Sequence, residues 1–135
     1  MQSFEDVRAS VAVHHALVTS EPYLLSFEVS LDGGARRQGM FLAELETEDG
    51  RKLLRISTPI ARLARVNAEK CLRFNWAQRA GFLAVGQLEK TEYLHLCENR
   101  TYGSLDDEEL QRLLAEMSTL ADQLEVAFNA GRDLA

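Results

Sequence analysis

The sequence predicts an α+β fold built on a mostly antiparallel five-stranded sheet, in the order α-β-β-β-α-β-β-α. Runs of alternating apolar and polar residues predict half-buried strands, and segments with apolar residues every three or four positions predict amphipathic helices. Short turn signals between successive strands favour antiparallel pairing. The chain has 135 residues and is 46% hydrophobic and 27% charged, so we expect one domain spanning residues 1–135.

The first helix and the first strand are predicted at residues 3–18 and 23–31. Ser3 is placed to cap the helix, with Asp6 three positions further on. Glu21-Pro22 is expected to end it. The segment 23–31 alternates almost strictly, which predicts a strand with one buried and one exposed face.

Two turn signals frame the next two strands. Asp32-Gly33-Gly34 precedes a strand at about 37–46. Asp49-Gly50 precedes a strand at 52–58 and is typical of a type I′ hairpin turn, because both residues readily adopt positive φ.

A second helix is predicted to begin at Thr58-Pro59, because a capping hydroxyl is followed by proline at the first helical position. It is expected to run to about residue 78. Asn67 falls on its apolar side, where an amide needs hydrogen-bond partners, so we interpret Asn67 as structural. Strands at 82–88 and 92–98 follow, joined by a short polar turn.

The last helix is predicted to begin at Ser104 or Asp106 and to end at Gly131. Its first turn is acidic at 107–109, where the helix dipole favours negative charge. The expected apolar stripe consists of Leu110, Leu113, Leu114, Met117, Leu120, Leu124 and Phe128.

Charge is distributed unevenly along this acidic chain, whose net charge is −6. Residues 51–79 contain eight basic side chains and one acidic one, between acidic flanks. This basic region has two interpretations: a solvated helix face balanced by neighbouring acidic helices, or a docking surface for an acidic partner. The candidate docking residues are Arg55, Arg62, Arg65 and Arg73.

Nucleic-acid binding is the main alternative function on the basis of charge. The basic region would contact phosphates, and Phe74 and Trp76 would stack on bases. The overall acidity of the chain argues against this function.

The sequence offers no catalytic or metal-binding constellation. His14 and His15 are adjacent and project in different directions from a helix, so they cannot share a metal. His95 and Cys97 lie two residues apart on one strand face, which is weak support for a catalytic pair, and Cys71 falls on an apolar face where a thiol is usually inert. We therefore expect no enzyme activity, no metal and no cofactor.

The remaining composition favours a cytoplasmic protein. No apolar run approaches the length of a membrane span, and the acidic N-terminus lacks the apolar core of a signal peptide. The two cysteines are better interpreted as buried thiols than as a disulfide.

The order of elements resembles the class I type III secretion chaperones and their relatives in the YbjN family of bacterial proteins. The resemblance covers nearly the whole chain. It is carried by the three consecutive strands, by Arg65-Val66-Asn67 in the middle helix, by the strand pair after it and by Leu105-Asp106-Asp107-Glu108-Glu109-Leu110 at the start of the last helix.

This resemblance implies a non-enzymatic homodimer that holds an extended segment of a client protein. In such chaperones the client buries side chains in shallow apolar patches and adds strands to the sheet edge. We expect Leu24, Met40 and Leu53 to be exposed apolar residues that accept the client by strand addition.

Overall fold

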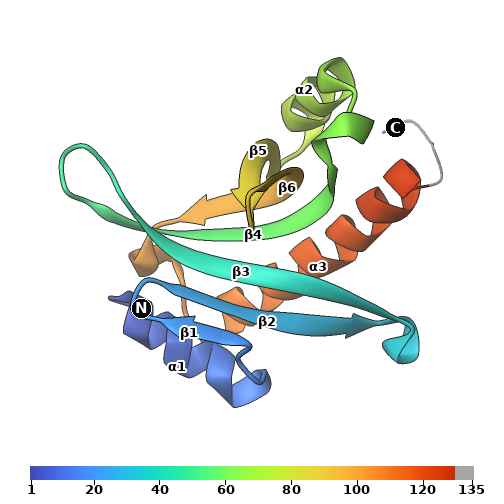
Figure 1. Ribbon diagram of the computed structural model, residues 1–135. Helices are drawn as coiled ribbons and strands as arrows, with labels where there is room; N and C mark the ends of the chain where they lie inside the picture. Colours follow the sequence, from blue (N-terminus) through green and yellow to red (C-terminus); the bar gives the residue numbers. More distant parts are fainter. Residues whose placement is uncertain (130–135) are drawn as a thin grey trace.

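Six antiparallel strands form one sheet in the order β1-β2-β3-β4-β6-β5, within the part of the chain that the structure describes (Figure 1). This part of the computed structural model comprises residues 1–129, without the side chains of Asp32, Arg65 and Asn129. The strands are β1 Thr19–Glu21, β2 Leu24–Leu31, β3 Arg36–Glu46, β4 Lys52–Arg62, β5 Phe82–Leu88 and β6 Thr91–Arg100. The helices are α1 Phe4–His14, α2 Ala68–Ala77 and α3 Asp107–Asn129, with short 3₁₀ turns at Asp32–Gly34, Leu63–Arg65 and Tyr102–Ser104.

The α+β class and the antiparallel sheet are confirmed, but the sheet has six strands where the sequence predicts five. The additional strand is β1, which lies between the helix predicted at 3–18 and the strand predicted at 23–31. The predicted end of the last helix at Gly131 lies outside the described residues.

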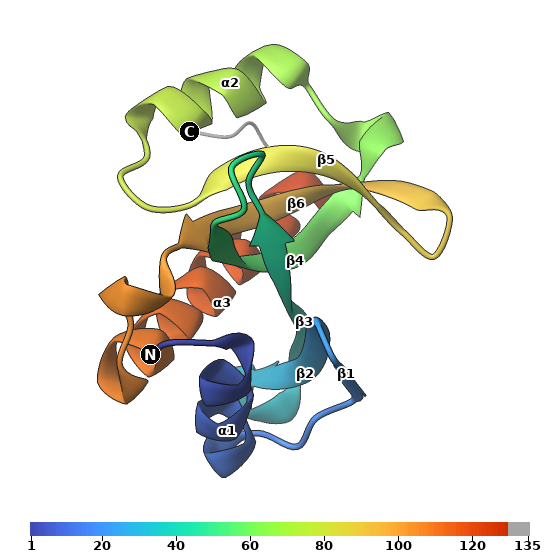
Figure 2. The same ribbon diagram turned by 90° about the vertical axis from the view of Figure 1, so that its left-hand side faces the viewer.

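The core lies between one face of the sheet and the helices α1 and α3 (Figures 1 and 2). α1 contributes Phe4, Val7 and Val11, and the sheet contributes residues such as Phe27 and Ile56, all less than 5% exposed. The buried part of the predicted α3 stripe is confirmed at Leu110, Leu113, Leu114, Met117 and Leu124. Burial of each large aliphatic side chain contributes about 1.5–3 kcal/mol, so this layer dominates stability.

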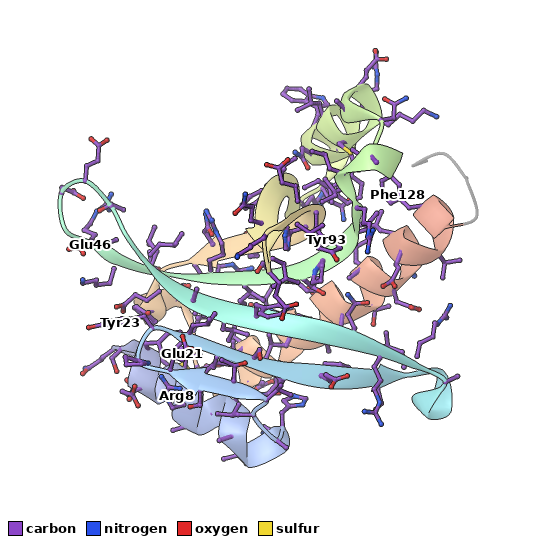
Figure 3. All side chains as sticks on the ribbon, viewed as in Figure 1. Arg8, Glu21, Tyr23, Glu46, Tyr93 and Phe128 are labelled. Carbon is purple, nitrogen blue, oxygen red and sulfur yellow. The ribbon has the colours of Figure 1, made fainter. Side chains whose placement is uncertain are left out.

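The first helix ends at His14 and not near Pro22, which corrects the predicted 3–18 helix. The capping prediction is confirmed, because Ser3 Oγ accepts a hydrogen bond from the Asp6 N–H at 3.4 Å. Further along, Arg8 reaches from α1 to the β1 segment (Figure 3), where it donates to Ser20 Oγ at 2.6 Å and to the Glu21 carbonyl. The β1 segment is therefore held as an edge strand by bonds that local helical spacing does not reveal.

The predicted helix start at Thr58-Pro59 is wrong, because both residues belong to β4. The Thr58 hydroxyl does not cap a helix: it is fully buried, donates to the Gly39 carbonyl at 2.7 Å and accepts from Gln38 Nε2 at 2.6 Å. Proline is tolerated here because the β3–β4 ladder has already ended at the pair Phe41–Ser57, and the β4–β6 register shifts just after Pro59.

The middle helix is consequently short and begins nine residues later than predicted, at Ala68 in place of Pro59. Asn67 is its N-cap: Asn67 Oδ1 accepts from the Lys70 N–H at 3.2 Å. Asn67 is thus structural, as predicted, but it lies at the start of α2 and not on an apolar face.

The remaining boundaries follow turn and capping chemistry. The loop after β3 has positive φ only at Gly50 and not at Asp49, so it is not the predicted type I′ turn. Glu89 and Lys90 both have positive φ and form the tight β5–β6 turn. Of the two predicted caps for the last helix, Asp106 is the one used, because Asp106 Oδ1 accepts from the Glu109 N–H at 2.7 Å.

Candidate functional site

The outer edge of β2 is only half covered. β1 pairs with β2 from Leu24 to Ser26, and the last bond on this side runs from the Val18 N–H to the Ser26 carbonyl at 2.8 Å. On the opposite side of β2, the Glu44 N–H donates to the Tyr23 carbonyl, so backbone groups of odd-numbered residues face β3. The backbone groups of Glu28 and Ser30 therefore face outward, beyond the part of β2 that pairs with β1. Figure 1 shows that β2 extends past β1.

An apolar trough of about 460 Å³ lies next to this open edge. Val29 and Leu31 alternate with the edge-facing residues, so their side chains project on the core side of the sheet, toward α3. The trough is lined by His14, His15, Val29, Leu31, Gln111, Leu114, Ala115, Ser118 and Thr119. An extended chain laid along β2 would thus find unpaired backbone groups and an apolar recess side by side.

One wall of this trough is polar. His15 stacks on Phe27 with the ring centroids 4.3 Å apart. Burial lowers the pKa of His15, the neighbouring His14 lowers it further, and the Gln111 side chain opposes the shift. Gln111 Nε2 is buried and has no hydrogen-bond partner among residues 1–129, so this wall contains an unsatisfied donor.

The three apolar residues predicted to bind a client do not come together. Met40 is fully buried, so the prediction that it is exposed is wrong: its side chain belongs to the core. Leu24 and Leu53 are half-buried and lie on the opposite sheet face from the trough, separated by β3. Sequence reasoning missed Val29 and His15, although the alternation of 23–31 already places Val29 on the apolar face.

The face of the sheet opposite the core is half-buried and carries no helix among the described residues (Figure 2). We call it the outer face. Its apolar members include Leu24, Phe41, Leu45, Leu53, Phe82, Leu88 and Tyr93. Half-buried apolar side chains on one sheet face that no helix covers form a candidate contact surface.

A polar cluster interrupts the outer face at β4 and β6. Arg55 Nε donates to Asn99 Oδ1 at 3.0 Å, and a cavity of about 190 Å³ next to it is lined partly by His95 and Cys97. His95 Nε2 lies 3.1 Å from the Gly86 carbonyl. Burial raises the pKa of the Cys97 thiol, and Arg55 opposes this only in part, so the thiol is protonated and poorly nucleophilic.

The basic residues of 51–79 are spread over several elements. Arg62 lies at the end of β4 and Arg73 on α2, and the side chain of Arg65 lies outside the described part of the structure. Three basic residues have acidic partners in exposed pairs: Arg51 with Asp49, Lys52 with Glu46 and Arg73 with Glu69. The positive charge of the region is thus partly neutralised within the chain.

Two apolar side chains on α2 are strongly exposed. Trp76 is 93% exposed and Leu72 is 68% exposed, and their spacing of four places them on one side of the helix. We call this pair the α2 ridge. α2 packs mainly against β5 and leaves the ridge uncovered.

A second trough of about 510 Å³ lies between α3 and the α2–β5 connection.

No group of three or more His, Cys, Asp or Glu side chains suited to a metal ion occurs in the described part of the chain. None of the described helices is long and apolar enough to cross a membrane.

The fold has relatives among solved structures, although no protein-family model matches the sequence and no curated protein sequence matches it. The chain is similar to one in the complex of ExsC with ExsE, with a TM-score of 0.64, 14% identity and coverage of 95% of this chain and 97% of that chain. It is also similar to one in the HopA1–SchA chaperone–effector complex, with a TM-score of 0.59, 14% identity and coverage of 91% and 89%.

The chain has a type III secretion chaperone-like fold. The fold implied by the resemblance is therefore confirmed, with β1 as an addition to the predicted elements. At 14% identity the likeness concerns the fold, and the relation to the YbjN family stays a prediction.

Proposed function

We propose that this protein is a chaperone-like binding module that holds an extended segment of a client protein at the open edge of β2. The single observation that supports this function most strongly is the position of the outward-facing Glu28 and Ser30 backbone beside the apolar trough. The likeness to a chain in a chaperone–effector complex supports the same function.

Binding would combine two kinds of contact. The client strand exchanges backbone hydrogen bonds with Glu28 and Ser30, each with a net contribution of about 0.5–1.5 kcal/mol. Every second client side chain enters the trough, and burial of one Leu or Ile there contributes about 1.5–3 kcal/mol. The backbone contacts do not depend on client sequence, so selectivity lies in the trough side chains. Leu24 and Leu53 remain predicted client contacts on the outer face.

We further propose a cytoplasmic, non-enzymatic homodimer in which two copies meet through the α2 ridge of Leu72 and Trp76. Exposed Trp side chains are enriched at the centres of protein interfaces, and this ridge has no cover within residues 1–129.

The experiment uses peptides selected from a random 12-residue display library on the wild-type protein. Their affinities are measured for the wild type, Ser30→Pro, Ser30→Ala and Val29→Asp. Proline removes the outward N–H at an edge position that tolerates it, so at least about tenfold weaker binding is expected. Ser30→Ala keeps the backbone and is the matched control. Selected peptides that bind Ser30→Pro and Val29→Asp as tightly as the wild type would refute the edge site.

Binding of nucleic acid or an acidic partner through the basic region is the alternative. Its support is the exposure of Arg62 and Arg79, and the ion pairs of Arg51, Lys52 and Arg73 count against it. This alternative predicts salt-sensitive retention on a polyanion column, abolished by Arg62→Glu with Arg79→Glu. Flow-through at low salt would eliminate it.

A further inference from the structure

β5 forms the other edge of the sheet, and one side chain already occupies part of it. Asn75 Oδ1 accepts from the Leu83 N–H at 2.6 Å, and Asn75 Nδ2 donates to the Leu83 carbonyl at 3.1 Å. These are the two bonds that a residue of a neighbouring antiparallel strand would make. We infer that Asn75 closes the β5 edge to strand addition by standing in for a strand residue.

The amide is held in place by the helix that carries it. α2 is capped at its start by Asn67 and at its end by the bond from the Gln78 N–H to the Phe74 carbonyl at 2.9 Å. Its packing partner is β5, and Figure 2 shows α2 running alongside that strand. An incoming strand would have to displace both the Asn75 amide and the helix behind it.

We call the two hydrogen bonds between Asn75 and Leu83 the Asn75 clamp. The part of β5 beyond this clamp is short. Because Leu83 faces outward, Val85 and Gln87 also present their backbone groups outward, while Ala84 and Gly86 face β6. A strand added to β5 could pair only with these two residues while Asn75 occupies Leu83. Two residues are few for a stable strand pair, so Asn75 removes much of the free energy that an added strand would gain. Edge strands left unprotected pair with further copies of the same chain, and a covering side chain is one way to prevent this.

The clamp gives the sheet one open edge, at β2, and one closed edge, at β5. If β2 accepts a client strand, as the proposed function requires, Asn75 ensures that strand addition is confined to that edge. The clamp itself does not depend on a client, because its expected competitor is the β5 strand of a second copy.

The test measures backbone amide hydrogen exchange at Leu83, Val85 and Gln87 over a range of protein concentrations, with sedimentation velocity on the same samples. The wild type, Asn75→Ala and Asn75→Asp are compared. In the wild type we expect Leu83 to be protected and Val85 and Gln87 to exchange at rates independent of concentration. In Asn75→Ala we expect Val85 and Gln87 to exchange about tenfold more slowly as concentration rises, with larger species in sedimentation.

Asn75→Asp retains the acceptor for the Leu83 N–H but places an anionic oxygen against the Leu83 carbonyl, so an intermediate effect is expected. It also provides the measurement if Asn75→Ala does not fold. Phe74→Ala is the control for general loosening of α2, because it removes a side chain that packs this helix on the core and leaves the Asn75 amide in place. The inference is overturned if folded Asn75 variants show no change at Val85 and Gln87, or if Phe74→Ala produces the same protection. No client peptide is present, so failure of the β2 site leaves these readouts unaffected.

Discussion

At the scale of single residues, Thr58 shows how a buried hydroxyl can join two strands after their ladder has ended. It accepts from Gln38 and donates to the Gly39 carbonyl, and Gln38 also donates to the Pro59 carbonyl at 3.1 Å. Thr58→Val keeps the shape but leaves the Gln38 amide with one partner fewer in a buried position. We expect a loss of about 1–3 kcal/mol in the free energy of unfolding, measured with urea.

Thr58→Ser is the matched control, because it keeps the hydroxyl and removes one methyl group, at a cost of about 0.8 kcal/mol. Equal stability of Thr58→Val and the wild type would contradict the role given to this hydrogen bond.

His95 and His15 make stability depend on pH. Burial lowers the pKa of both, opposed at His95 by the hydrogen bond to Gly86. The folded state therefore binds fewer protons than the unfolded state once the pH falls through the unfolded value of 6.5. Stability should be greatest above this pH and should fall as pH decreases from 6.5 to the folded pKa values.

Urea unfolding between pH 8 and pH 5 measures this dependence. His95→Gln should flatten it by removing one of the two groups. A rise in stability on acidification, or an unchanged slope in His95→Gln, would contradict the assignment.

At the scale of elements, the start of α2 can be tested directly at Asn67. Asn67→Ala removes the oxygen that caps the helix and should cost about 0.5–2 kcal/mol, whereas Asn67→Asp keeps it. A helix that began at Thr58, as the sequence predicts, would place Asn67 on its apolar side, where Asn67→Asp would be more destabilising than Asn67→Ala. Comparison of the two variants by thermal unfolding distinguishes these starts.

Elements whose signals are local could be predicted from the sequence. Strict alternation located β2, and the hydrophobic stripe with an acidic first turn located α3. The errors at 15–21 and 58–67 have one physical cause: partners distant in sequence override local preference. Arg8 and Ser26 hold β1 in the sheet, and Gln38 captures the Thr58 hydroxyl that otherwise signals a cap.

Only part of the candidate site could be predicted from the sequence. Val29 is on the predicted apolar face, but its position in an open trough depends on how far β1 extends along β2. The resemblance to secretion chaperones predicts that Met40 is an exposed client contact, but Met40 is fully buried because its side chain lies on the face of β3 that the core helices cover. Exposure is a property of the assembled layers and not of one strand.

At the scale of the whole molecule, the layers leave the outer face and the α2 ridge without cover. We expect the wild type to be a dimer in sedimentation equilibrium. Trp76→Lys should weaken the dimer by roughly thirtyfold, the effect of losing about 2 kcal/mol at an interface hot spot. The monomer should keep its stability within about 0.5 kcal/mol, because Trp76 is 93% exposed.

Val13→Lys is the control, because Val13 is also strongly exposed, at 77%, but lies on α1. A wild type that stays monomeric at every concentration, or a Val13 variant as dissociated as the Trp76 variant, would rule out the ridge as the interface.

The brevity of β1 has a consequence for engineering. This strand begins at Thr19, and its continuation backward by two paired residues would reach Glu28 and satisfy its backbone. The length of the segment between α1 and β1 thus sets how much of the β2 edge is accessible. A longer segment that paired with Glu28 would occlude this edge without altering the core. A shorter segment would leave more of β2 unpaired and accessible to another strand.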